Sequence, residues 1–242
     1  MNGFYKYLLL GCFAGIAAFS CRAQSNTMGW LASFNTVKLK GKWSLHTDVQ
    51  LRSTHELAHM NQILLRPGIN YQLNKKMIVS AGYAYTHVRG VVANESGYIP
   101  DQRIWEQFIY NHRIKPVYTQ HRFRLEQRFL TKPILDNGKI KGGKDFYANR
   151  LRYFIRNILP LQKQAVFAKG AFVALQNEVF LNFGNTRNLN GKFFDQNRLY
   201  GAAGYRFSKA FDVEAGYMYQ YVQGRNSNTN NNIIQVATYL RL

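Results

Sequence analysis

The sequence predicts an all-β protein, an antiparallel transmembrane β-barrel with short periplasmic turns and longer extracellular loops. Three observations predict this class: apolar and polar residues alternate with period two over long segments, the connections alternate in length, and the N-terminus resembles a secretory signal peptide. Residues 1–23 are predicted to be the cleaved signal peptide, and residues 24–242 a single barrel domain.

The signal peptide is predicted from the order of three regions. Residues 1–7 carry one positive charge at Lys6, residues 8–19 are apolar or small, and Cys21 and Ala23 place small residues just before Gln24. The apolar run is too short for the ~20 residues of a membrane-spanning helix. Acylation of Cys12 or Cys21 is the alternative to cleavage after Ala23. The cleaved chain would hold no cysteine, which excludes disulfides and thiol chemistry.

Period-two alternation places apolar and polar side chains on opposite faces of a strand. For example, Phe123 and Leu125 alternate with Arg122, Arg124 and Glu126. The segments with this pattern are 28–39, 42–53, 62–73, 77–89, 103–114, 118–131, 146–158, 165–183, 196–207, 211–222 and 232–242.

The length of these segments favours a membrane barrel over a soluble sandwich. Most run about 11–14 residues, whereas soluble strands average ~5–6 and tilted membrane strands ~9–11. The predicted short turns are 40–41, 74–76, 115–117, 159–163 and 208–210, and the predicted long loops are 54–61, 89–102, 132–145, 184–195 and 223–231.

The number of strands is predicted to be ten or twelve. With short turns in the periplasm, an eleventh strand would make the first one begin outside the cell, and bacterial single-chain barrels have even strand numbers. Either residues 28–39 do not span, which leaves ten strands and is the first choice, or residues 165–183 contain a bend, which gives twelve.

Several motifs along the wall resemble the domain-of-unknown-function family 2490 of outer-membrane barrels. They are Arg103-Ile104-Trp105-Glu106-Gln107-Phe108, Arg122-Phe123-Arg124-Leu125-Glu126-Gln127-Arg128, Asn149-Arg150-Leu151-Arg152-Tyr153, Asn177-Glu178-Val179-Phe180 and Gln196-Asn197-Arg198-Leu199-Tyr200. The resemblance covers the whole mature chain and implies a fold and a location in the outer membrane of a Gram-negative bacterium. It implies no activity and no functional residue. Leu242 departs from the terminal aromatic residue usual in such barrels.

The formal charge of +20 comes from lysines in turns and arginines on the polar faces of strands. Export and barrel patterning argue against nucleic acid as the partner. Charges in a narrow lumen must be paired, so the favoured interpretation is a structural network. A positively biased lumen that attracts small anions is the alternative. The candidate lumen network comprises Arg122, Arg124, Glu126, Arg128, Arg150, Arg152, Arg156, Glu178, Arg198 and Arg206, and Arg66, Asp212 and Glu214 lie on the same polar faces.

A zinc-protease motif, H-E-x-x-H, occurs at His55-Glu56-Leu57-Ala58-His59. The chemistry requires a helix of several turns that puts both histidines on one face, together with a third ligand. Here the motif lies in a short connection, and Pro67-Gly68 follows closely. A metal site at His55 and His59 is therefore rejected.

The hairpin around Pro116 places polar groups on the outer face. Pairing Ile104 with Phe129 and Tyr110 with Phe123 sets Glu106 opposite Gln127, and His112 opposite His121. A carboxyl group facing lipid is costly and often functional, so a lipid-modifying enzyme is the second alternative. No serine at that depth completes a triad.

The prediction that follows is an outer-membrane barrel that is not an enzyme, with no catalytic residues and no cofactor. Its expected partners are outer-membrane lipid and lipopolysaccharide and the barrel-assembly machinery, with small anions added under the channel alternative.

Overall fold

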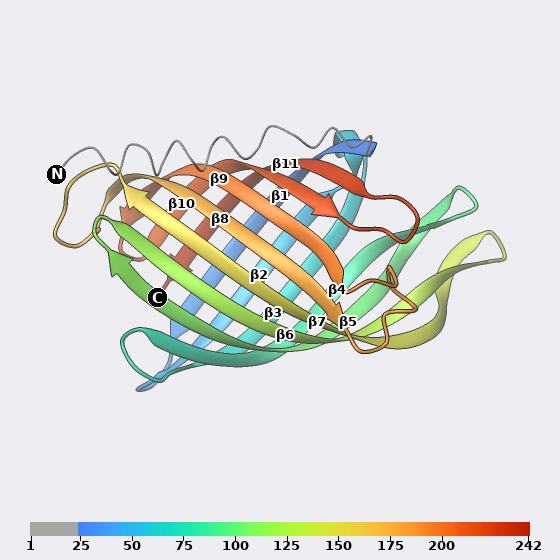
Figure 1. Ribbon diagram of the computed structural model, residues 1–242, viewed down its shortest axis with the longest axis horizontal. Coiled ribbons are helices and arrows are strands. Elements are labelled where there is room, and N and C mark those ends of the chain that lie inside the picture. Colours follow the sequence, from blue (N-terminus) through green and yellow to red (C-terminus); the bar gives the residue numbers. More distant parts are fainter. Residues whose placement is uncertain (1–23) are drawn as a thin grey trace.

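A computed structural model describes residues 24–242, which form a closed barrel of eleven strands (Figure 1). The predicted signal peptide lies outside the described residues. The strands are β1 (Gln24–Lys38), β2 (Trp43–Ser53), β3 (Met60–Gln72), β4 (Met77–Val92), β5 (Glu95–Ile114), β6 (Val117–Asp136), β7 (Lys139–Pro160), β8 (Gly170–Phe183), β9 (Phe194–Ser208), β10 (Phe211–Val222) and β11 (Thr229–Arg241). The described chain contains one three-residue 3-10 helix, η2 (His55–Leu57), and no helix long and apolar enough to cross a membrane.

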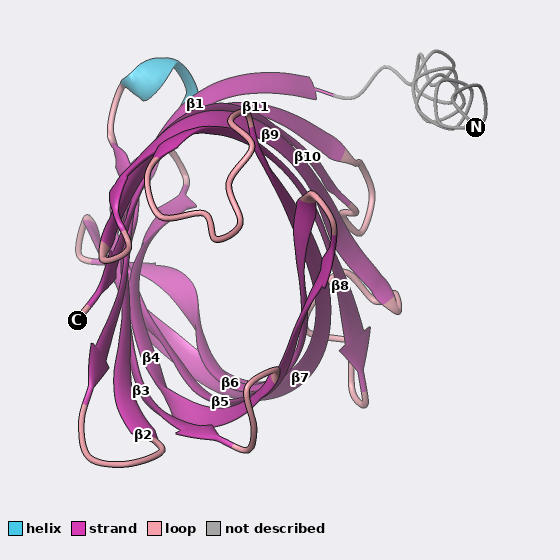
Figure 2. Ribbon diagram, turned by 90° about the vertical axis from the view of Figure 1, so that its left-hand side faces the viewer, coloured by secondary structure: helices cyan, strands magenta, loops and turns pink. Residues whose placement is uncertain are grey.

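The barrel closes through a parallel pair. Every strand pairs antiparallel with its chain neighbour, and β1 pairs parallel with β11 from Gln24↔Thr229 to Thr36↔Arg241. Figure 2 looks along the barrel and shows the strands as a closed ring. The strand number is eleven, between the predicted ten and twelve. An up-and-down chain with an odd number of strands ends in the direction in which it began, so its first and last strands pair parallel. The segment 28–39, which the ten-strand interpretation left out, belongs to the closed sheet up to Lys38.

The extra strand of the twelve-strand interpretation does not form. Strand β8 begins at Gly170, and residues 161–169 connect it to β7. Phe167 in this connection packs against Phe172 and Ala174, which lie on the inward face of β8. The predicted strand over 165–183 therefore starts too early, because the apolar residues at its beginning fold inward as a loop.

The connections divide the barrel into two ends. The turn end holds residues 39–42, 73–76, 115–116, 161–169 and 209–210, and the hairpin end holds the others. Two predicted long loops, 89–102 and 132–145, are instead extended hairpins that project from the hairpin end (Figure 1). They turn at Ala93-Asn94 and Asn137-Gly138, whose φ angles lie between 49° and 71°, the left-handed conformation that two-residue hairpin turns require.

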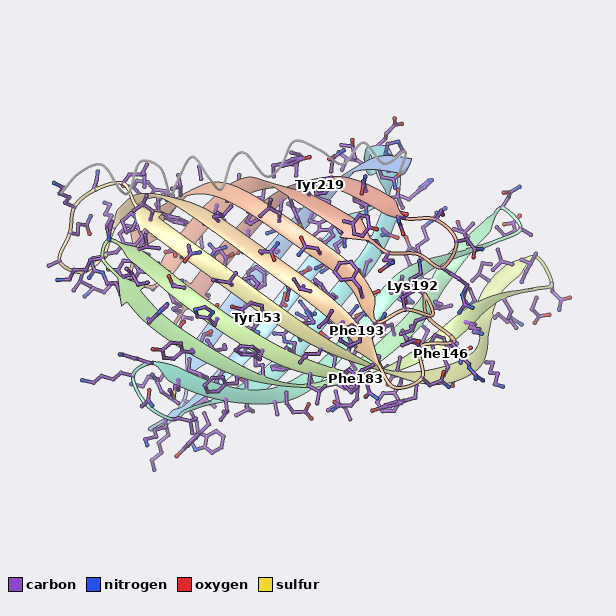
Figure 3. The ribbon with its side chains drawn as sticks, in the orientation of Figure 1. Phe146, Tyr153, Phe183, Lys192, Phe193 and Tyr219 are labelled. Carbon is purple, nitrogen blue, oxygen red and sulfur yellow. The ribbon has the colours of Figure 1, made fainter. Side chains whose placement is uncertain are left out.

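The two faces of the wall differ in polarity. Apolar and aromatic side chains point outward, including Leu65, Tyr85 and Phe123, and polar and charged side chains point inward and are buried. In Figure 3 the labelled Tyr153 and Tyr219 lie along the wall, and Phe146, Phe183 and Phe193 lie toward the hairpin end. The barrel is thus apolar outside and polar inside, the reverse of a soluble domain.

One large side chain of the interior depends on glycines in the adjacent strands. Trp105 of β5 is fully buried and lies over Gly68 and Gly82. A Cβ atom at Gly82 would lie 2.3 Å from the backbone oxygen of Pro67 and 2.5 Å from the Trp105 ring. Backbone cannot move aside as a flexible side chain can, so the sheet requires glycine here.

We predict that Gly82→Ala lowers the free energy of unfolding by about 1–3 kcal/mol, the usual cost of overpacking. The measurement is urea-induced unfolding of the barrel reconstituted in lipid. Gly201→Ala is the matched control, because a Cβ at Gly201 meets nothing within 4 Å, and its effect should stay below about 0.5 kcal/mol. Equal effects of the two substitutions would contradict the packing argument.

Candidate functional site

The interior of the barrel carries many charged side chains because every second residue of each strand points there. On β6, β7 and β9 the inward residues are the even-numbered ones. They include every residue of the predicted lumen network that lies on those strands. The inward arginines are Arg52, Arg66, Arg103, Arg122, Arg124, Arg128, Arg150, Arg152, Arg156, Arg198 and Arg206, and their carboxylate neighbours are Asp48, Asp101, Glu126, Glu178, Asp195, Asp212 and Glu214. Arginines outnumber carboxylates, so an arginine must either share a carboxylate or find another partner.

Glu126 is the most heavily shared carboxylate. It is fully buried on β6 and accepts hydrogen bonds from Arg150 Nε and Nη2 at 3.0 and 2.7 Å and from Arg152 Nη1 at 2.6 Å. Arg103 Nη1 of β5 lies 3.8 Å away. Arg150 is the cross-strand neighbour of Glu126, whereas Arg152 reaches it diagonally. One carboxylate thus connects three strands.

Glu178 on β8 continues this network toward the turn end. Its Oε1 atom accepts from Arg152 Nε and Nη2 at 3.0 and 2.7 Å and from Arg122 Nη2 at 2.8 Å. Arg152 therefore bridges Glu126 and Glu178. The remaining ion pairs of the interior among the described residues are Arg66–Asp48, Arg103–Asp101, Arg128–Asp101, Arg150–Asp195, Arg156–Glu214, Arg206–Asp212 and Arg241–Asp212.

Three inward arginines have no carboxylate within ion-pair distance among the described residues, and each is held by a glutamine instead. Arg124 donates to Gln107 Oε1 at 3.0 and 2.6 Å. Arg52 donates from Nε and Nη2 to Gln50 at 3.1 and 2.5 Å. Arg198 donates from Nε to Gln196 at 3.1 Å. A neutral amide oxygen accepts from some of the donors and leaves the positive charge in place.

Aromatic rings stabilise these three guanidinium groups. The Arg124 carbon Cζ lies 4.9 Å from the ring centre of Trp105. Arg52 and Arg198 both approach Trp30 of β1, at 4.0 and 5.0 Å. Cation–π contacts of this kind favour a cation without neutralising it.

Two cavities lie within the ring of strands and meet at its middle. The cavity on the hairpin side has a volume of about 300 Å³ and the one on the turn side about 410 Å³. Both are lined by Trp30, Arg52, Arg66, Arg152 and Arg198. These five side chains therefore lie where the two cavities adjoin, and we call this group the constriction.

The model of the family "Protein of unknown function (DUF2490)" matches residues 27–231. The chain belongs to this family. No curated protein matches the chain. A solved structure, titled "NanC porin structure in rhombohedral crystal form", is similar with a TM-score of 0.51 and 12% sequence identity, over 89% of this chain and 98% of the porin. At this identity the likeness concerns the fold alone, which is a porin-like β-barrel.

The lumen network predicted from the sequence omitted several residues that point into the barrel. Arg52 and Arg103 were not among the candidates, and neither were Asp48 and Asp101. The signal was available, since Arg52 follows the outward Leu51 and Arg103 precedes the outward Ile104. The glutamine partners could not have been found in this way, because period two fixes the face of a side chain and not its partner.

The H-E-x-x-H segment forms the 3-10 helix η2, with Glu56 and Leu57 at φ 53° and 59°. His55 Nδ1 accepts a hydrogen bond from the backbone N–H of Thr27 at 2.9 Å. A three-residue 3-10 helix does not place the two histidines on one α-helical face. Among residues 24–242 no group of three or more His, Cys, Asp or Glu side chains is arranged to hold a metal ion.

The predicted register of the β5–β6 hairpin is wrong by two residues. Ile104 pairs with Gln127, and Tyr110 with His121, because the turn consists of Lys115 and Pro116 alone. A shift of two preserves the faces. Glu106 therefore stays outward and accepts a diagonal hydrogen bond from Gln127 Nε2 at 3.2 Å.

We predict that Glu126→Gln lowers the free energy of unfolding by about 3–5 kcal/mol, because it leaves buried arginines without their shared carboxylate. Glu56→Gln, at an exposed position of η2, is the control and should be neutral. Arg124→Gln should cost less than Glu126→Gln, since Arg124 has no carboxylate partner. Urea unfolding in lipid measures all three, and a neutral Glu126→Gln would contradict the network.

Proposed function

We propose that this protein is an outer-membrane barrel whose interior favours the entry of small anions. The observation that carries the proposal is that three inward arginines, Arg52, Arg124 and Arg198, are held by glutamines rather than carboxylates. The glutamine oxygens accept hydrogen bonds from these guanidinium groups but do not balance their charges. In a narrow, low-dielectric interior, uncompensated charge of one sign attracts ions of the other.

Two observations support a location in the outer membrane. The outward face of the wall is apolar and aromatic around the ring, which suits contact with lipid and lipopolysaccharide. Residues 1–23 have the sequence of a signal peptide for export. Delivery to the membrane by the barrel-assembly machinery belongs to the same proposal.

The structural network and the anion preference are assigned to different arginines. Arginines that share Glu126 and Glu178 hold neighbouring strands together. Because carboxylates balance their charge, they contribute less to the potential inside the barrel. The glutamine-held arginines make no ion pair and supply the net positive field. Barrel stability and ion preference can therefore be separated by mutation.

No observation favours the lipid-modifying alternative. Glu106 on the outer face is engaged by Gln127. A hydrogen bond of this kind is a structural solution for a polar group on an apolar surface. The proposal therefore assigns no catalytic residue and no cofactor.

We expect the protein to fractionate with outer membranes and to migrate faster on gels before boiling than after it, as closed barrels do. Recovery from the soluble periplasm would contradict the proposed location. The control is Glu126→Gln, which should lose the fast-migrating form at a lower temperature because the network is broken.

We expect the wild-type protein in planar bilayers to conduct chloride in preference to potassium. Gln107→Glu places a carboxylate against Arg124 and should lower the anion-to-cation permeability ratio roughly threefold or more. The new carboxylate keeps the two hydrogen bonds that Gln107 Oε1 accepts from Arg124 Nε and Nη2, so the variant should fold.

The matched control is Gln102→Glu, the same change at an exposed position on the outer face of β5, which should leave the permeability ratio unchanged. A wild-type protein that prefers cations would reject the proposal, as would a ratio that Gln107→Glu does not move.

A further inference from the structure

The cavity on the hairpin side has an unusual lining. Its volume is about 300 Å³, and its only acidic lining residue is Asp101. The lining arginines are Arg52, Arg66, Arg103, Arg128, Arg150, Arg152 and Arg198. Glutamine and asparagine side chains complete the polar part of the wall.

Two of the three uncompensated arginines meet in this cavity. Arg52 comes from β2 and Arg198 from β9, and both approach the ring of Trp30 on β1. Trp30 is the cross-strand neighbour of Arg52, whereas Arg198 reaches it across β10 and β11. Two positive charges without carboxylate partners are thus held beside one ring at the constriction.

These guanidinium groups keep hydrogen-bond donors to spare. An arginine has five N–H bonds. Arg52 uses its three nitrogens toward Gln50 and Gln62, one bond each, and Arg198 uses Nε toward Gln196. The Gln220 side-chain oxygen also accepts a hydrogen bond from Arg198 Nη2 at 3.3 Å. These contacts leave two N–H bonds of Arg52 and both N–H bonds of Arg198 Nη1.

Other polar atoms of the lining show the same excess of donors. Buried atoms of lining residues without a hydrogen-bond partner in the described chain are Trp30 Nε1, Arg66 Nε and Arg128 Nε, and all three are donors. Unsatisfied buried polar groups are costly. A ligand that brings acceptors and negative charge would satisfy what the protein leaves open.

We propose that Arg52, Arg198 and Trp30 form a binding site for a small, doubly charged oxyanion. The charge follows from the two uncompensated guanidinium groups, and the oxygen acceptors follow from the excess of donors. Arginine forks match both carboxylate and phosphate oxygens. The volume of about 300 Å³ limits the ligand to a short dicarboxylate or a phosphate compound of a few atoms.

This site rests on the proposed function, because it lies at the constriction that a permeating anion would have to pass. It adds a position where the anion stays bound. A site of this kind predicts saturable binding and a flux that levels off with concentration, whereas a merely positive lumen predicts neither.

The test uses the full-length protein purified in detergent, titrated calorimetrically with succinate or inorganic phosphate at pH 8, and with acetate as the monoanion. We expect one saturable site, with a dissociation constant for one or both dianions at least tenfold below that for acetate. Tighter binding of succinate identifies a dicarboxylate site, and tighter binding of phosphate a phosphate site.

Arg52→Gln and Arg198→Gln should each weaken dianion binding about tenfold or more. Neither residue forms an ion pair, so both variants should fold, which heat-modifiable migration checks. Arg187→Gln is the matched control, since it removes the same charge from an exposed connection at the same end, and it should bind like the wild type.

Failure of the site and failure of the proposed function give different results. Anion preference in bilayers without saturable dianion binding would overturn the site and leave the proposed function standing. Saturable binding that Arg52→Gln and Arg198→Gln do not weaken would also overturn it. If saturable binding is lost in both variants but the wild-type protein shows no anion preference in bilayers, the binding site would be supported and the proposed function rejected.

Discussion

Glu126 accepts hydrogen bonds from Arg150 and Arg152 and lies near Arg103, so one buried carboxylate holds guanidinium groups from β5 and β7 around β6. The rest of the interior depends on this sharing. Closing a sheet of long strands puts half of the side chains into a narrow space, where a charge must be paired and hydrogen-bonded. Arg124 and Arg152 lie directly opposite each other on β6 and β7. Like charges so placed repel, and Arg152 turns to the carboxylates while Arg124 turns to Gln107.

That division explains how the interior can be both stable and positively biased. The ion pairs connect neighbouring strands and also strands further apart, as Arg156 of β7 does with Glu214 of β10. Arginines without carboxylates use glutamine oxygens and aromatic rings, which satisfy geometry without removing charge. The positive bias is then a consequence of partner choice, because the arginines that supply it are hydrogen-bonded to glutamines and not ion-paired.

The sequence was sufficient to predict the fold class, because period two and segment length together report a two-faced wall taller than a soluble strand. It placed Arg150 and Arg198 on inward faces for the same reason. It was insufficient for the ends of the barrel. Residues 165–168 are apolar and imitate the start of a strand, but Phe167 folds inward within a loop. The hairpins turning at Asn94 and Asn137 lack a strong alternation. Partners such as Gln50 and Gln196 follow from register and side-chain reach, which a single strand's pattern does not encode.

The odd strand number has a consequence for the interior. A barrel with an even number of strands would have closed either without β1 or with one more strand. In either arrangement a different strand would lie beside β11. With eleven strands, β1 pairs parallel with β11, and Trp30 packs against Ile233, Met218 and Tyr200. This packing fixes the indole ring between β2 and β9, where Arg52 and Arg198 reach it from either side of the seam. The expectation of an even strand number argued against this parallel closure. The parallel pairing of β1 with β11 is nevertheless what brings the two uncompensated charges together.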